Sequence, residues 1–154
     1  MLSISSAQSP REARAVSSEL EHMTPPEALA SLMARVQAGR VHEHHIWEAV
    51  RILSQAGQLS DDFRYSPEFR ALMERNALRD ALLLVVQSTR PARRIEFLHP
   101  SDSDWTCIVK FVDFPSASFK ATQRDAVAAI LAALLFSVRQ HMVLSGNTEG
   151  EADV

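Results

Sequence analysis

The sequence has few of the residues on which several kinds of protein depend. Cys107 is the one cysteine among 154 residues, so no disulfide can form within the chain. This excludes a disulfide-stapled secreted domain and favours a reducing compartment. The four glycines do not cluster, which excludes the glycine-rich phosphate loops of the common nucleotide-binding folds.

Signals for export and for membrane insertion are also missing. Residues 1–10 have neither a basic start nor an apolar core, so they do not form a conventional secretory signal. No uninterrupted apolar run approaches the roughly 20 residues needed to span a bilayer. We therefore expect a soluble cytoplasmic protein that does not interact with membranes.

The chain has no basic excess. Its formal net charge is −3, and it would be zero without residues 145–154, which contain three acids and no base. A protein that binds nucleic acid through phosphate contacts usually has a marked positive charge. Fourteen of the sixteen basic residues are arginine, a bias typical of GC-rich bacterial or phage genomes.

The first third of the chain predicts helices. Serine-rich residues 1–9 are expected to be disordered, and residues 10–57 to form a helical unit. Its first helix is expected over residues 10–22. A second helix begins after Thr24, because Thr24 and Glu27 have the spacing of a capping box.

Glycines predict where two of these helices end. Gly39 lies where the second helix is expected to have a left-handed C-terminal cap. Gly57 follows a third helix, expected from about His42 to Ala56. Its apolar side chains recur at helical spacing on one face, at Ile46, Ala49, Val50 and Leu53.

Residues 60–144 predict an α-β-β-β-α unit. A helix is expected from Ser66, its N-cap, to about Thr89, with a bend at Asn76. Alternating residues then predict strands over residues 94–98, 105–112 and 117–121, with a loop at 99–104.

The strongest strand predicts how the sheet packs. Its apolar face holds Trp105, Cys107, Val109 and Phe111, which we expect to meet an alanine-rich helix that begins after Thr122. This helix is expected to end before Gly146, leaving residues 145–154 as a disordered acidic tail. The predicted fold class is α+β, in which helices cover a three-stranded antiparallel meander and an N-terminal helical unit precedes it.

Part of this unit resembles a known family. The strand DWTCIVKF at 104–111, the segment ASFKAT at 117–122 and the helix AILAALL at 129–135 are similar to the small phage ABA-sandwich family. The resemblance covers about a fifth of the chain and rests on a Trp-bearing strand followed by an alanine- and leucine-rich helix. It implies a phage or prophage accessory protein. The family has no established catalytic residues, so it implies no site.

The order α-β-β-β-α also occurs in the double-stranded RNA-binding domain. That fold has a basic cluster at the start of its last helix, whereas this chain has only Lys120 and Arg124 there, beside Asp125. Small acidic secretion chaperones are similar in size and charge alone.

Three groups of residues contain histidine, cysteine or aspartate, the types that bind metals or act in catalysis. His42, His44 and His45 surround Glu43, but they lack the spacing of a common metal motif, and a polar, partly titrating helix start explains them better. Cys107 on a core-facing strand is expected to be a small buried hydrophobe. Asp102 and Asp104 are expected to form a turn. We therefore predict no catalytic residue, metal or cofactor.

The candidate binding residues are arginines on the helix at 66–89 and at its junction with the first strand. They can form a surface for an acidic protein or nucleic acid, or a solvated face neutralised by neighbouring acids at 68, 74 and 80. The candidate partner-binding set is Arg64, Arg70, Arg75, Arg79, Arg90, Arg93 and Arg94.

These observations favour a non-enzymatic accessory protein that binds and modulates a protein complex of a bacterial host, such as a defence system. The alternatives are a nucleic-acid-binding regulator that uses the arginine surface and an enzyme with dispersed active-site residues. Exposed sheet edges and the N-terminal helices would also suit a homodimer.

Overall fold

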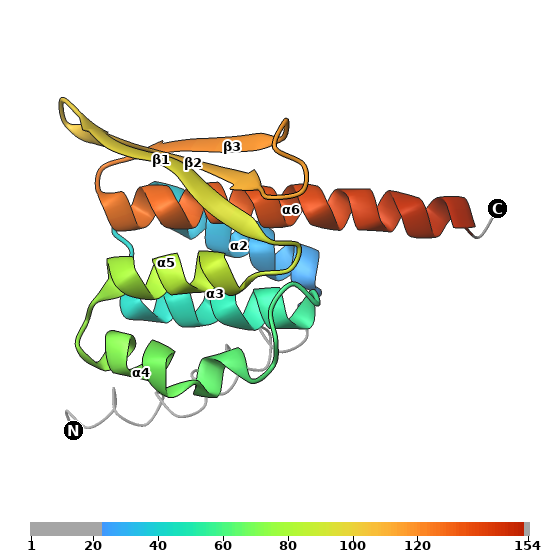
Figure 1. The fold of residues 1–154 in the computed structure, drawn as a ribbon, viewed down its shortest axis with the longest axis horizontal. Coiled ribbons are helices and arrows are strands. Elements are labelled where there is room, and N and C mark those ends of the chain that lie inside the picture. Colours follow the sequence, from blue (N-terminus) through green and yellow to red (C-terminus); the bar gives the residue numbers. More distant parts are fainter. Residues whose placement is uncertain (1–22, 153–154) are drawn as a thin grey trace, which may run out of the picture.

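A computed structural model describes the backbone of residues 23–152 and the side chains of residues 23–145. The fold class is α+β, as predicted, and its elements form layers with a long C-terminal helix between a sheet and a group of shorter helices (Figure 1). The elements are α2 (Pro25–Ala38), α3 (Glu43–Gln55), the 3-10 turn η2 (Phe63–Tyr65), α4 (Pro67–Glu74), α5 (Leu78–Ser88), β1 (Arg93–Ser101), β2 (Asp104–Phe111), β3 (Ser118–Gln123) and α6 (Ala126–Ala152). The helix expected at 10–22 and the tail expected at 1–9 lie outside the described residues.

Local signals start and stop α2 and α3. The capping box is confirmed, since the Thr24 side chain accepts from the Glu27 backbone N–H and the Glu27 carboxylate accepts from the Thr24 N–H. Gly57 ends α3 with φ at 75°. The left-handed cap expected at Gly39 is wrong, because Gly39 is extended. The extended backbone there carries the chain on to Val41, which is buried in the core.

The helix expected over 66–89 is divided in two at Asn76. Ser66 caps α4 as predicted, its hydroxyl accepting from the backbone N–H of Phe69 at 3.3 Å. Asn76 then adopts a left-handed φ of 59°, and its N–H and that of Ala77 donate to the carbonyls of Met73 and Leu72. This is a Schellman-type helix end with asparagine in the position usually held by glycine. The predicted bend is therefore a full helix end.

The sheet is an antiparallel meander in the order β1-β2-β3. Cys107, Val109 and Phe111 are buried on the face that meets α6, which confirms the predicted register of β2. The loop expected at 99–104 is wrong, because β1 continues to Ser101, paired with Asp104. Asp102, with a φ of 49°, makes the hairpin tight enough for the strands to pair up to it. Asp102 thus forms the turn as expected, whereas Asp104, expected in the same turn, is the first residue of β2.

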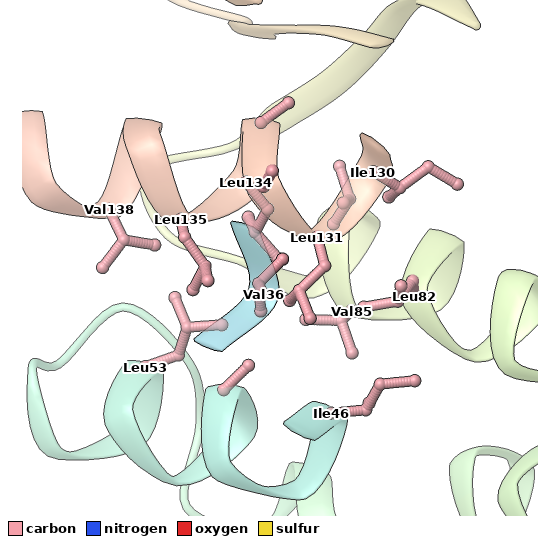
Figure 2. Close-up of a cluster of buried hydrophobic side chains, with 14 of the residues drawn as sticks. Val36, Ile46, Leu53, Leu82, Val85, Ile130, Leu131, Leu134, Leu135 and Val138 are labelled. Carbon is pink, nitrogen blue, oxygen red and sulfur yellow. The ribbon is translucent and has the colours of Figure 1, made fainter. Parts of the chain in front are cut away.

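Helix α6 passes through the centre of the core. Residues 128–135 are buried all round, and Leu131, Leu134, Leu135 and Val138 lie toward side chains of α2, α3 and α5 (Figure 2). One hydrophobic cluster therefore joins the two predicted units, 10–57 and 60–144.

The C-terminal half of α6 differs from expectation. The helix continues to Ala152, so the disordered tail expected at 145–154 is wrong for residues 145–152. A glycine costs a helix only about 1 kcal/mol, which does not stop a helix already nucleated by a buried segment. Residues 126–145, with a mean hydropathy of 1.8, are long and apolar enough to cross a membrane by length and composition, and 56% of the stretch is buried in the core. No apolar run of this length was expected here, because polar residues at 137, 139, 140 and 141 interrupt the stretch.

Candidate partner-binding surfaces

An aromatic base lies beneath η2 and the start of α4. Phe69 is fully buried, and its ring lies 4.7 Å from that of Phe63 and 5.1 Å, edge on, from that of Trp47 on α3. Aromatic pairs at such distances add to the stabilisation that comes from burial. Phe63 of η2 is therefore linked to Trp47 of α3 through the buried ring of Phe69 on α4.

Tyr65 lies in η2 together with Phe63, but its side chain is exposed to solvent. Its side chain is 57% exposed, the second most exposed of the large hydrophobic side chains among the described residues. The guanidinium carbon of Arg64 lies 4.8 Å from the centre of its ring, and that of Arg70 lies 5.5 Å away. The Nε of Arg70 also donates to the Arg64 carbonyl at 3.2 Å. We call these three residues the Tyr65 cluster.

Neither arginine of the Tyr65 cluster forms an ion pair within the described residues, so both can bind a partner's carboxylate. The two ion pairs in the described part of the chain join Arg35 to Glu48 and Lys110 to Glu96. Asp61, Asp62 and Glu68 are exposed close by in the sequence, but none contacts Arg64 or Arg70 as an ion pair. The two guanidinium groups can donate hydrogen bonds to carboxylates of a partner, and the ring of Tyr65 beside them offers an apolar contact.

The structure brings only two of the seven predicted arginines together. Arg75 and Arg79 were expected on the single helix at 66–89, but the break at Asn76 separates them, with Arg75 at the C-cap of α4 and Arg79 on α5. Arg79 instead lies over Trp105 of β2, at 5.6 Å from the ring centre. Arg90 and Arg94 are exposed at the junction of α5 and β1.

Arg93 is not on the surface, contrary to expectation. It is 3% exposed, and its guanidinium donates to the Ser137 hydroxyl at 2.8 Å, to the Gln58 side-chain oxygen and to the Pro91 carbonyl at 3.3 Å. Burial lowers the pKa of Arg93 to about 10, which leaves it protonated at neutral pH. Its charge is turned inward, over the ring of Phe111 at 4.9 Å.

A groove between α2 and the C-terminal half of α6, from Arg139 onward (the outer half of α6), was not predicted from the sequence. The groove has a volume of about 490 Å³, and mostly apolar side chains line it, among them Leu29, Met33, Met142 and Val143, with Gln37 and Arg139 as polar members. The apolar residues Met142 and Val143, which follow the fully buried part of the last helix, were the one available signal. The groove itself depends on how α2 pairs with α6, which no local pattern encodes.

The histidine cluster lies at the start of α3, and Cys107 lies in β2. The rings of His44 and His45 lie 4.0 Å apart, and His45 Nδ1 accepts from the backbone N–H of His42 at 2.9 Å. Within residues 23–145 no group of three or more His, Cys, Asp or Glu side chains is placed to hold a metal ion. Cys107 is buried, and burial raises the pKa of its thiol to about 11, so the thiol stays protonated.

Comparisons with known proteins identify no relative. No family model, no curated protein and no solved structure matches the chain.

Proposed function

We propose that this is a non-catalytic protein that binds and modulates a partner protein, with the Tyr65 cluster at the centre of its contact surface. The observation that carries the proposal is an exposed tyrosine whose ring lies within 5.5 Å of two guanidinium groups that form no ion pair, next to the buried pair of Phe63 and Phe69. Tyrosine and arginine are enriched among the few residues that dominate binding energy at protein interfaces.

The geometry favours a partner with carboxylates around a shallow apolar patch. The Tyr65 ring supplies contact area at small cost in conformational entropy, and each guanidinium supplies donors for a carboxylate. The aromatic contacts of Phe63 and Phe69 already order this segment in the free protein. Little conformational entropy is therefore lost when a partner binds.

The proposed setting is the cytoplasm of a bacterial host, where a phage or prophage protein acts on a host complex such as a defence system. This setting rests on the resemblance of residues 104–135 to the phage ABA-sandwich family. The Tyr65 cluster supports the binding role independently of that resemblance.

The test is capture of partners from a bacterial lysate by the tagged full chain, compared with the variants Tyr65→Ala and Arg64→Glu/Arg70→Glu. A partner that contacts the cluster should bind the purified variants at least about tenfold more weakly. Arg75→Glu is the matched control, because Arg75 is an exposed arginine near α4 that does not contact Tyr65. It should retain the partner.

Two results would contradict the proposal. One is capture of the same proteins by all variants, with circular dichroism showing that each is folded. The other is binding to labelled duplex DNA or single-stranded RNA that weakens steeply with salt, as phosphate contacts do. That second result would support the nucleic-acid alternative, since bases also stack on tyrosine and arginine.

A further inference from the structure

The outer half of α6 carries apolar side chains away from the core. Helix α6 extends beyond the other described elements at its C-terminal end (Figure 1). Val143 is 51% exposed and Leu144 is 52% exposed on this part, whereas residues 128–135 are buried. Single exposed apolar residues are ordinary, but here two adjoin an apolar groove on the same helix.

We propose that the groove between α2 and α6 is filled by the outer half of α6 from a second copy of this chain. A two-fold dimer needs one surface patch that complements itself. Met142 and Val143 line the groove, while Val143 and Leu144 are also exposed beside it. The same helical segment can therefore line the groove of one copy and enter the groove of the other. The patch therefore has both halves of a symmetric contact.

The charges of α6 select an antiparallel pairing. Arg139 is the only Lys or Arg in residues 126–152, and Glu149 and Glu151 are the only acids. With a rise of about 1.5 Å per residue, Arg139 lies about 7 Å before the Val143–Leu144 pair and the acids about 8–11 Å after it. Two helices that cross antiparallel at this pair therefore bring the turn that carries Arg139 in each copy level with the turns that carry the acids in the sequence of the other.

A parallel arrangement would place like charges together, which disfavours it. The lining of the groove fits the antiparallel occupant as well. Its floor is made by Leu29 and Met33, and methionine adapts its shape to a neighbouring helix. The dimer would join two α2 and two α6 helices, with apolar contacts at the centre and opposite charges at both ends.

Sedimentation velocity of the full chain over a wide range of concentration tests the pairing. The wild type should dimerise, and Val143→Glu should weaken association by about tenfold or more, because it places a charge in the apolar centre. Val143 is half exposed in the single chain, so this variant should still fold. Phe114→Glu, at a residue that is 64% exposed between β2 and β3, is the matched control and should leave the dimer intact.

Charge reversal tests the antiparallel register. Arg139→Glu should weaken the dimer, and combining it with Glu149→Arg/Glu151→Arg should restore association toward the wild-type value. A wild type that is monomeric throughout would overturn the proposal, as would a dimer unaffected by Val143→Glu. A monomer that floats with phosphatidylcholine vesicles would assign this surface to lipid and overturn it too. Failure of the reversal to restore the dimer would overturn the antiparallel register.

Discussion

Arg93 shows how one buried side chain can join three parts of the fold. Its guanidinium donates to Ser137 of α6, to Gln58 after α3 and to the carbonyl of Pro91 before β1. Only a planar group with five donors reaches acceptors in so many directions. The Gln58 side-chain nitrogen is buried without a hydrogen-bond partner in the described residues. The pair of Arg93 and Gln58 is thus a polar unit enclosed by apolar surroundings.

We expect Arg93→Met and Gln58→Leu to be costly singly and less so together. Either change leaves buried polar atoms of the other residue unpaired, which costs about 1–3 kcal/mol of unfolding free energy. The double variant removes both, so its loss should be smaller than the sum by about 1 kcal/mol or more. Urea denaturation measures the four free energies. Arg94→Met, at an exposed neighbour, should change stability by less than about 0.5 kcal/mol, and additive losses would contradict the coupling.

At the scale of elements, the start of α3 depends on an uncharged histidine. His45 is buried, and its Nδ1 accepts from the His42 N–H, a role usually played by glutamine or glutamate at this position. Burial lowers the pKa of His45, the charges of His44 and Arg35 lower it further, and Glu48 opposes them. Protonation would remove the acceptor and place a positive charge at a helix N-terminus, where the dipole disfavours it.

Stability should therefore fall as the pH falls. An unfolded histidine takes up its proton near pH 6.5, whereas His45 in the fold does so at lower pH, so the unfolded state binds more protons between the two values. The free energy of unfolding should be constant above about pH 6.5 and decrease as the pH drops toward the pKa of the folded state. His45→Gln keeps an acceptor that does not titrate, and it should flatten this dependence in urea titrations at several pH values.

His141 is the control for this measurement. Burial and the nearby charge of Arg93 also lower the pKa of His141, so His141→Gln should remove a separate part of the dependence. If His45→Gln left the pH profile unchanged, the histidine cap would have no role in stability.

Elements set by neighbours in sequence were predictable, and those set by distant partners were not. The capping box at Thr24 and the cap at Ser66 involve residues three apart, and the face of β2 follows from simple alternation. Asn76 was expected to bend a helix but ends it, because asparagine adopts the left-handed backbone with little strain.

The candidate site divides in the same way. Arg64 and Arg70 were predicted as surface arginines and are exposed, but the Tyr65 ring that both of them contact was not singled out. Arg93 was misplaced because its partners, Gln58 and Ser137, are 35 and 44 residues away in the sequence. From the sequence alone an arginine is predicted to be exposed, unless the buried acceptors that it contacts are known.

The whole molecule is built around α6, which has a sheet on one side and helices on the other (Figure 1). Its leucines at 131, 134 and 135 lie toward α2, α3 and α5 (Figure 2). With about 100° per residue, the alanines at 129 and 133 lie on the opposite side of the helix, toward the sheet. Both alanines are fully buried, so the sheet lies as close to the helix backbone as a methyl group allows.

Enlarging one of these alanines should separate the layers. Ala129→Leu adds three carbons where Ala129 has no exposed surface, and overpacking of this kind costs about 1–3 kcal/mol. Ala71→Leu makes the same change on the exposed side of α4, so it should alter stability by less than about 0.5 kcal/mol. Thermal and urea unfolding compare the two variants. Because β2 is held between β1 and β3, a displaced sheet should also perturb the near-ultraviolet signal of Trp105, which packs against the core. An Ala129→Leu variant as stable as the wild type would show that α6 and the sheet are not in close contact at this position.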